Sequence, residues 1–239
     1  MTGRGILALA LLLAGPARGH GPFHAQIGAA SERVARQPGD ARALVARGEL
    51  YRQHGDFDRA LADFAAAARA LPPADVDLLE GATLIDAGRA HQALVHLHRH
   101  LSRHPDSAAG YLERARAHEA IAAREAAADD YQRGLALLPR PTVEQCLRRS
   151  RLQLAAGRPE AALGGLDEAI AQLGPLPELE RPAIALEMEA RRWEQALARL
   201  KALPPSTRAS LAAVEKQARR QVNAASRPAA GGSSRSRGR

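Results

Sequence analysis

Cysteine, aromatic residues and long apolar runs are all scarce in this chain of 239 residues. Cys146 is the single cysteine, so no disulfide can form within the chain and a packed core must hold the fold. Aromatic residues make up only 3% of the sequence, and β-branched runs are rare, which argues against an extensive sheet. Alanine, leucine and arginine are abundant instead, and they enter helices at little cost. We therefore expect an all-α protein.

The sequence also lacks the common catalytic motifs. It contains no phosphate-binding glycine loop, no H-E-x-x-H zinc motif and no C-x-x-C pair. Asp129 and Asp130 are adjacent, and neighbouring residues on a helix point about 100° apart, so the pair is expected to be surface charge. Cys146 lies among helical apolar positions with no activating base nearby, and we expect it to pack as a small hydrophobe. We expect no enzymatic activity and no cofactor, unless the chain is a regulatory subunit whose partner supplies the chemistry.

The first residues follow the order of a secretory signal. Arg4 precedes an apolar run over 6–14, and the small residues Ala17 and Gly19 come after it. This run is too short for a membrane span, and no other segment approaches that length. We expect a signal peptide over 1–19, with cleavage near Gly19, and a periplasmic or secreted protein without a transmembrane segment. The alternative is a cytosolic protein whose first helix is apolar.

The net charge of +8 is concentrated at the two ends of the chain. Two arginines lie within 1–19 and four lie within 225–239, and neither segment holds an acid, so residues 20–224 carry only +2. The Gly/Ser/Arg-rich composition of 225–239 cannot build a core and predicts a disordered basic tail. A nearly neutral folded part gives no reason to expect nucleic-acid binding.

A period of 33 to 35 residues runs through the middle of the chain. A small residue recurs at Ala60, Ala93, Ala127, Ala162 and Ala196, and a large residue follows four positions later at Phe64, Leu97, Tyr131, Leu166 and Leu200. Glycines recur at 48 and 81 and at 55, 88 and 157, and prolines recur at 72, 105 and 139. We expect Gly48 and Ala60 to lie where two helices cross closely, and Gly55 to end the first of them in a left-handed conformation.

This pattern resembles the tetratricopeptide repeat family, whose unit is a 34-residue helix–turn–helix. The first copy matches best, through Leu44, Gly48, Tyr51, Gly55, Phe57, Ala60, Phe64, Ala67 and Pro72. The fifth copy departs from the pattern, because Arg191 stands where the turn glycine belongs. The resemblance implies an all-α, right-handed superhelical solenoid of about five repeats over 41–205, with an N-terminal capping helix over 20–40 and a C-terminal capping helix over 206–224.

Proteins of this family are generally interaction scaffolds, so the resemblance implies a protein or peptide partner held in a concave groove. The family's groove positions fall on the first helices of the first four copies, at Arg42, Val45, Glu49, Arg52, Gln53, Leu78, Ile85, Asp86, Leu112, Arg116, Glu119, Leu147, Arg151 and Leu154. Leucines flanked by arginines suit a partner segment with apolar anchors and some acidic residues. Val45 and Glu49 stand where the family's carboxylate-clamp variant has lysine and asparagine, so we do not expect binding to chaperone C-terminal tails.

The segment 91–105 contains five of the nine histidines. His96, His100 and His104 share one helical stripe, and imidazoles on adjacent turns can chelate Zn²⁺ or Cu²⁺. The alternative function is therefore a periplasmic, histidine-rich metal-binding or metal-handling protein. Two features oppose this reading: arginines border the stripe, and 91–105 contains no carboxylate. His100 also occupies a position that is small in other copies, which favours a packing role at a helix contact.

Overall fold

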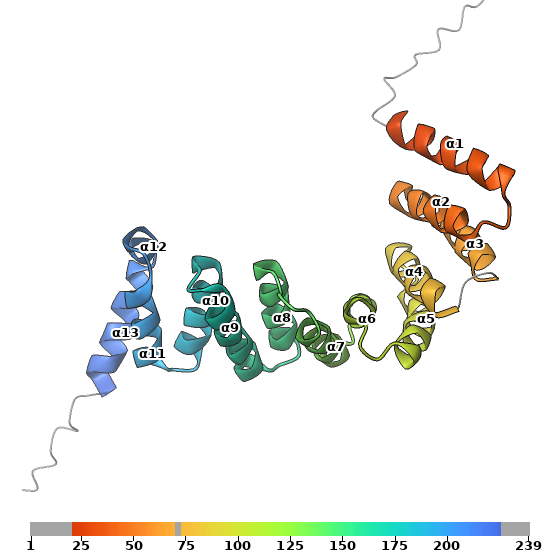
Figure 1. The fold of residues 1–239 in the computed structure, drawn as a ribbon. Helices are drawn as coiled ribbons and strands as arrows, with labels where there is room; N and C mark the ends of the chain where they lie inside the picture. Colours follow the sequence, from red (N-terminus) through yellow and green to blue (C-terminus); the bar gives the residue numbers. More distant parts are fainter. Residues whose placement is uncertain (1–20, 70–72, 226–239) are drawn as a thin grey trace, which may run out of the picture. The chain divides into compact units, whose positions relative to one another are not determined.

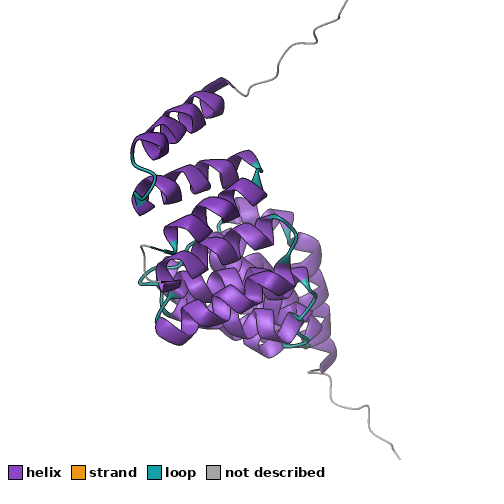
Figure 2. Cartoon of the chain, turned by 90° about the vertical axis from the view of Figure 1, so that its right-hand side faces the viewer, coloured by secondary structure: helices purple, strands orange, loops and turns teal. Residues whose placement is uncertain are grey.

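The computed structural model describes residues 21–69 and 73–225, without the side chains of 21–23 and 73–75. Within these ranges the chain forms helices and no strands (Figures 1 and 2), which confirms the all-α prediction. The helices are α1 Gly21–Arg36, α2 Ala41–His54, α3 Phe57–Ala67, α4 Pro73–Asp86, α5 Ala90–Arg103, α6 Ala108–Ala120, α7 Arg124–Ala136, α8 Val143–Ala155, α9 Pro159–Leu173, α10 Pro177–Glu189, α11 Trp193–Ala202, α12 Pro205–Ser210 and α13 Ala212–Ala225. No helix in these ranges combines the length and apolarity that crossing a membrane requires.

The chain divides into two compact units, one ending at Arg89 and the other beginning at Ala90. In unit 1, α1 packs on α2, α2 on α3 and α3 on α4. In unit 2, the helices α5 to α11 pack in sequence order, each on its neighbour, and α13 packs on α11. The pairs α2/α3, α6/α7, α8/α9 and α10/α11 are antiparallel hairpins of the predicted kind, joined by short turns. We number them by their repeat copy, so that α2/α3 is the first hairpin, α6/α7 the third, α8/α9 the fourth and α10/α11 the fifth.

The repeated apolar residues form the core of both units. All five alanines of the repeat are completely buried, and so are four of the five large residues, while Tyr131 is 4% exposed. Gly48 lies against the ring of Phe64, where a Cβ atom would approach Cε1 to 2.7 Å. The predicted close helix crossing in the first hairpin is therefore confirmed, since no larger residue fits there without displacing Phe64.

The turn between the two helices of each of the five repeat copies has the same backbone conformation. Gly55, Gly88 and Gly157 have φ angles of 84°, 73° and 73°, as predicted for helix-ending glycines. Two non-glycine residues adopt the same left-handed conformation, Ala122 and Arg191, both with φ of 58°. The spacing of these five turns repeats that of the alanines, so the register continues through the fifth copy although glycine is absent there.

Short polar side chains start several of the helices. Asp40 accepts hydrogen bonds from the backbone of α2, Asp56 from that of α3, and Ser107 from that of α6. Thr142 and Gln145 form a reciprocal capping box at the start of α8. These caps fix where α2, α3, α6 and α8 begin, independently of the core.

The ends of the repeat array differ in detail from the predicted segments. Helix α1 occupies 21–36 of the segment 20–40. The single helix predicted over 206–224 is instead two helices, α12 and α13, because Leu211 between them departs from helical geometry. Ala225 belongs to α13 rather than to the predicted tail. The predicted signal peptide, the remainder of the tail and Pro72 lie outside the described residues.

Candidate functional site

In unit 1, three of the four charged side chains at the predicted groove positions pair with one another. The Arg52 guanidinium lies 2.9 Å from the Glu49 carboxylate on the same helix, and it also reaches Asp86 on α4 at 2.7 Å. Val45 is half-buried against the apolar core. Arg42 and Gln53 are exposed, and Leu78 and Ile85 are half-buried. Arg52 is therefore already neutralised by two carboxylates and offers little to an acidic partner.

In unit 2, the groove positions of α6 are occupied in a similar way. The Arg116 guanidinium lies 2.6 Å from the Glu113 carboxylate. Glu119 pairs with Arg148 of α8, which joins the first helices of the third and fourth hairpins. Leu112 is half-buried against the core of the third hairpin.

Helix α8 presents a different surface at its groove positions. Leu147 packs against the core of the fourth hairpin, whereas 40% of Leu154 is exposed. Arg151 lies between them on the same stripe of the helix, is exposed, and makes no ion pair with any described residue. Helix α8 is joined to α6 by the ion pair of Arg148 with Glu119, and it also contacts α10. Its neighbours are therefore the first helices of the third and fifth hairpins. We call Leu147, Arg151 and Leu154 the α8 face.

A second set of polar residues, which sequence reasoning missed, lies inside the hairpins. In the first hairpin, Arg47 of α2 donates two hydrogen bonds to Asp63 of α3, at 2.8 and 2.7 Å. In the third hairpin, Arg114 of α6 donates two to Asp130 of α7, both at 2.7 Å. Each pair is separated by 16 residues and recurs in the repeat register. That recurrence is the signal in the sequence that could have revealed the pairs.

The fourth and fifth hairpins vary this arrangement. In the fourth, Arg149 occupies the arginine position of α8, but Gly165 stands at the aspartate position of α9. Arg149 donates to the Gly165 carbonyl oxygen and to the Glu168 carboxylate, the latter at 2.9 Å. In the fifth, the arginine is on the second helix: Arg199 of α11 pairs with Glu180 and Glu187 of α10. Burial raises the pKa of Glu187 above its usual range, although its hydrogen bond from Arg199 opposes this.

The histidine-rich helix α5 uses one of its imidazoles as a packing residue. His100 is only 7% exposed, and its Nε2 atom lies 2.8 Å from the hydroxyl oxygen of Ser107, the residue that caps α6. Its ring fills the space left by Gly110, where a Cβ atom would approach His100 to 2.7 Å. The predicted packing role of His100 therefore has a specific contact. The His104 ring lies 5.0 Å from that of His100, measured between centroids.

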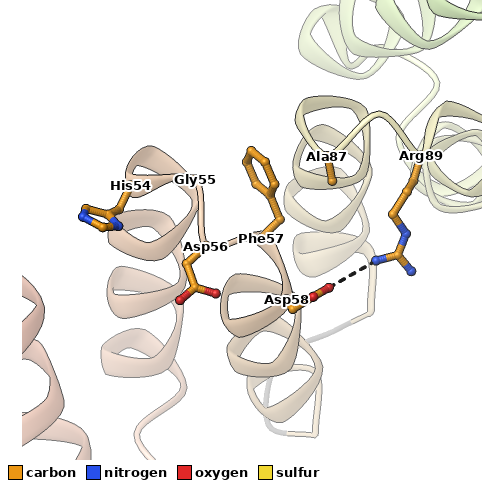
Figure 3. A pocket seen from close by; sticks show the side chains of 7 residues that line it. All are labelled: His54, Gly55, Asp56, Phe57, Asp58, Ala87 and Arg89. Carbon is orange, nitrogen blue, oxygen red and sulfur yellow. Dashed lines mark hydrogen bonds and ion pairs between the residues drawn. The ribbon is translucent and has the colours of Figure 1, made fainter.

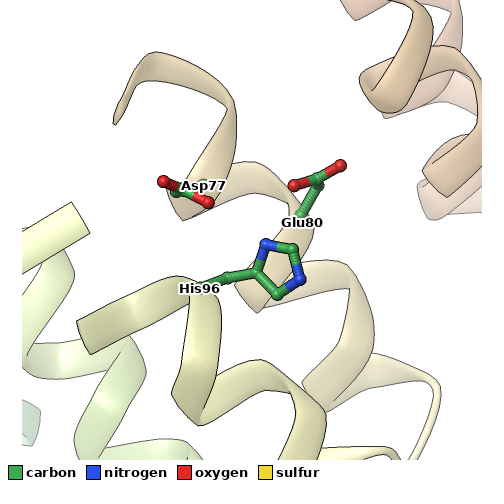
Figure 4. Close-up of side chains that lie close together, drawn as sticks. All are labelled: Asp77, Glu80 and His96. Atoms are coloured by element: carbon green, nitrogen blue, oxygen red, sulfur yellow. The ribbon is translucent and has the colours of Figure 1, made fainter. Parts of the chain in front are cut away.

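Figure 4 draws His96 of α5 together with Asp77 and Glu80 of α4. Asp77 is buried and Glu80 is half-buried in unit 1, whereas His96 is half-buried in unit 2. Because these residues belong to different units, we assign no metal site to them.

An open hollow lies beside the turns of unit 1 (Figure 3). It has a volume of about 650 Å³ and is lined by His54, Gly55, Asp56, Phe57, Asp58, Ala87 and Arg89. Arg89 reaches Asp58 at 3.5 Å, but 95% of that carboxylate side chain is exposed. An ion pair so open to water contributes little, and we assign no function to this hollow.

The fold is that of known tetratricopeptide proteins. The chain resembles MamA from Desulfovibrio magneticus RS-1 with a TM-score of 0.55 and 17% identity, over 64% of this chain and 86% of that one. It resembles a tetratricopeptide repeat protein from Parabacteroides merdae with a TM-score of 0.52 and 14% identity, over 85% and 79%. It also resembles the Cut9–Hcn1 hetero-tetramer of the APC/C, with a TM-score of 0.55 and 14% identity, over 87% of this chain and 40% of that one.

At these identities the likeness establishes the fold alone, and with it the predicted class of helix–turn–helix repeats. No protein-family model matches the sequence, and no curated protein is significantly similar to it.

Proposed function

We propose that this protein is a non-enzymatic interaction scaffold that binds a partner segment on the α8 face. The observation that carries the proposal is the combination of an exposed arginine with an exposed leucine, which α8 has at Arg151 and Leu154 and which Arg42 lacks, since the neighbouring Val45 is half-buried. Arg52 and Arg116 are each held by carboxylates of their own unit, whereas Arg151 is exposed beside the exposed Leu154. Two of the similar proteins named above support a scaffold in general, since one is a tetratricopeptide repeat protein and the other a subunit assembly by their descriptions.

The α8 face favours a partner segment of defined chemistry. Arg151 offers a guanidinium that can take a carboxylate in a two-pronged hydrogen bond, and Leu154 offers an apolar contact one turn further along. A complementary segment therefore carries an aspartate or glutamate next to a leucine-sized side chain. Solenoid repeats commonly bind extended or helical segments of this kind across their first helices.

Selection from a displayed library of random peptides tests this proposal, because the library samples partner segments of every composition. Enriched peptides are expected to contain an acid beside an apolar residue and to lose binding to the variants Arg151→Glu and Leu154→Ala. The control is Arg124→Glu, which reverses an exposed charge on α7 rather than on α8. Peptides that bind Arg151→Glu as well as the unchanged protein would place the binding surface elsewhere.

We also propose that the chain is exported, on the strength of the signal-like pattern in residues 1–19. Expression in a Gram-negative host tests this: the full chain should appear in the periplasm and be shortened by about the length of the signal. A chain lacking residues 2–19 should stay in the cytoplasm. Equal distribution of the two forms would contradict export.

A further inference from the structure

A pocket of about 320 Å³ lies in unit 2 where α7, the following loop, α8 and α9 meet. Its apolar wall includes Leu135, Leu138, Pro139, Pro141 and Cys146, and its polar lining consists of Gln132, Arg149, Glu168 and Gln172. Cys146 is 1% exposed and forms part of the deep side, whereas Glu168 and Gln172 are exposed and mark the opening. The pocket is distinct from the α8 face and has the size of a small-molecule site.

The positively charged group in this pocket is the Arg149 guanidinium. Its side chain is only 9% exposed, and its Nε atom has no hydrogen-bond partner among the described residues. Its one carboxylate partner, Glu168, is 60% exposed and makes a single contact with it. Such a carboxylate can turn toward water at little cost, because exposed ion pairs are weak.

Comparison with the first and third hairpins shows that the fourth lacks an aspartate to pair with its arginine. Arg47 and Arg114 occupy the same position as Arg149, and each is bound by both oxygens of an aspartate on the second helix. Gly165 takes the place of that aspartate in the fourth hairpin, and the Arg149 guanidinium lies directly over it. The fourth hairpin thus keeps the buried cation but lacks the buried anion, and a pocket opens beside the cation.

We propose that this pocket binds a small carboxylic acid with a short apolar chain. The carboxylate of the ligand pairs with Arg149 and displaces Glu168 toward water, while the chain lies against Leu135, Leu138 and Cys146. The ligand supplies the negative charge that an aspartate supplies in the first and third hairpins. Because a buried guanidinium binds a carboxylate far better than a neutral group, the acid is favoured over its amide.

Calorimetric titration of the full chain with hexanoate tests the proposal, with hexanamide as the neutral ligand of the same shape. We expect hexanoate to bind with a dissociation constant of about 1 mM or below, and hexanamide to bind at least about tenfold more weakly. Arg149→Gln should abolish hexanoate binding. Gly165→Asp should abolish it as well, because this substitution installs in the fourth hairpin the carboxylate that holds Arg114 in the third. Arg140→Gln is the matched control: Arg140 lies between two prolines of the pocket wall but does not line the pocket, so hexanoate binding should be unchanged.

The single cysteine provides a second measurement. Hexanoate should slow the reaction of Cys146 with a thiol reagent in the unchanged protein and leave it unchanged in Gly165→Asp. Equal binding of hexanoate and hexanamide, or unchanged hexanoate binding in Gly165→Asp, would overturn the proposal. So would a result in which a pentapeptide ending in leucine binds the Arg151→Glu protein and hexanoate does not, because the carboxylate would then belong to a peptide bound away from the α8 face. None of these outcomes depends on peptide binding at the α8 face, so the two proposals can fail separately.

Discussion

The third hairpin, α6/α7, and the fourth hairpin, α8/α9, carry the same arginine on their first helix and differ in what meets it on the second. Arg114 is bound by both oxygens of Asp130, whereas Arg149 lies over Gly165 and shares a single contact with the exposed Glu168. The apolar residues around the two arginines follow the same register. A repeat can therefore change from a closed internal ion pair to a candidate binding pocket through one residue, without altering the core that holds the hairpin together.

Breaking the closed pair should have the largest effect. Asp130→Ala leaves Arg114 largely buried without its carboxylate, and we expect the free energy of unfolding to fall by about 3 kcal/mol. Urea-induced unfolding followed by circular dichroism measures it. Glu168→Ala in the fourth hairpin is the counterpart, and it should cost less than about 1 kcal/mol because Glu168 is exposed. Equal losses in the two variants would mean that the hairpins do not differ as described.

The turns of the same two hairpins differ in their left-handed residue, which is alanine in the third and glycine in the fourth. Exchanging these residues should change the free energy of unfolding by similar amounts in opposite directions. Ala122 in the third hairpin has a positive φ angle that alanine rarely adopts, whereas Gly157 in the fourth adopts it freely. We expect Ala122→Gly to raise the free energy of unfolding by about 1 kcal/mol and Gly157→Ala to lower it by about 1 kcal/mol. Thermal and urea unfolding of both variants would check this, and a loss of stability in Ala122→Gly would contradict the shared turn geometry.

The substitution Gly165→Asp should give the fourth hairpin the closed ion pair of the third. Gly165→Asp requires the Arg149 side chain to move, because a Cβ atom would lie 2.8 Å from its Nε, but the guanidinium is the far end of a flexible chain. The new carboxylate and the removal of a glycine from a helix interior should together raise the free energy of unfolding by about 0.5–1 kcal/mol. A loss of more than about 1 kcal/mol in urea unfolding would show that the fourth hairpin cannot adopt the arrangement of the third.

The smallest expected effect is a pH-dependent loss of stability that comes from His118 in the third hairpin. His118 lies beside the closed pair, with its Nε2 atom 3.6 Å from Asp130, and burial lowers its pKa below 6.5. Asp130 opposes this shift, while Arg114 and His98 add to it. The unfolded chain therefore takes up a proton at higher pH than the folded chain, so stability declines as the pH falls below about 6.5. His118→Asn should reduce this decline between pH 8 and pH 5; an unchanged decline would exclude His118 as its source.

The apolar residues of the repeat could be predicted from the sequence because each is dictated by local geometry. Ala60 and its equivalents must be small where helices cross, and Phe64 and its equivalents must fill the layer next to them. These positions recur every 33 to 35 residues and are buried in every copy. The left-handed turns could be predicted at Gly55, Gly88 and Gly157, because glycine adopts a positive φ angle easily. The same conformation at Ala122 could not be predicted, because alanine rarely adopts it.

The charged residues could not be predicted in the same way, because the partner of an arginine depends on which acids its long side chain reaches across helices. Arg52 and Arg116 stay predicted groove residues, but the sequence did not reveal that each binds acids of its own unit. The pocket beside Arg149 was missed because it arises from a substitution, Gly165, that is unremarkable when read within a single helix. It becomes visible only when the copies are compared position by position.

The most direct test of this difference is a crystal structure of the protein soaked with 6-bromohexanoate, using the anomalous signal of bromine. We expect a bromine peak inside the pocket near Cys146 and a carboxylate within hydrogen-bonding distance of Arg149, with Glu168 turned outward. The Gly165→Asp protein, treated in the same way, should show no bromine there. A peak outside the pocket, or the same peak in both proteins, would contradict the claim that the missing aspartate makes Arg149 a carboxylate site.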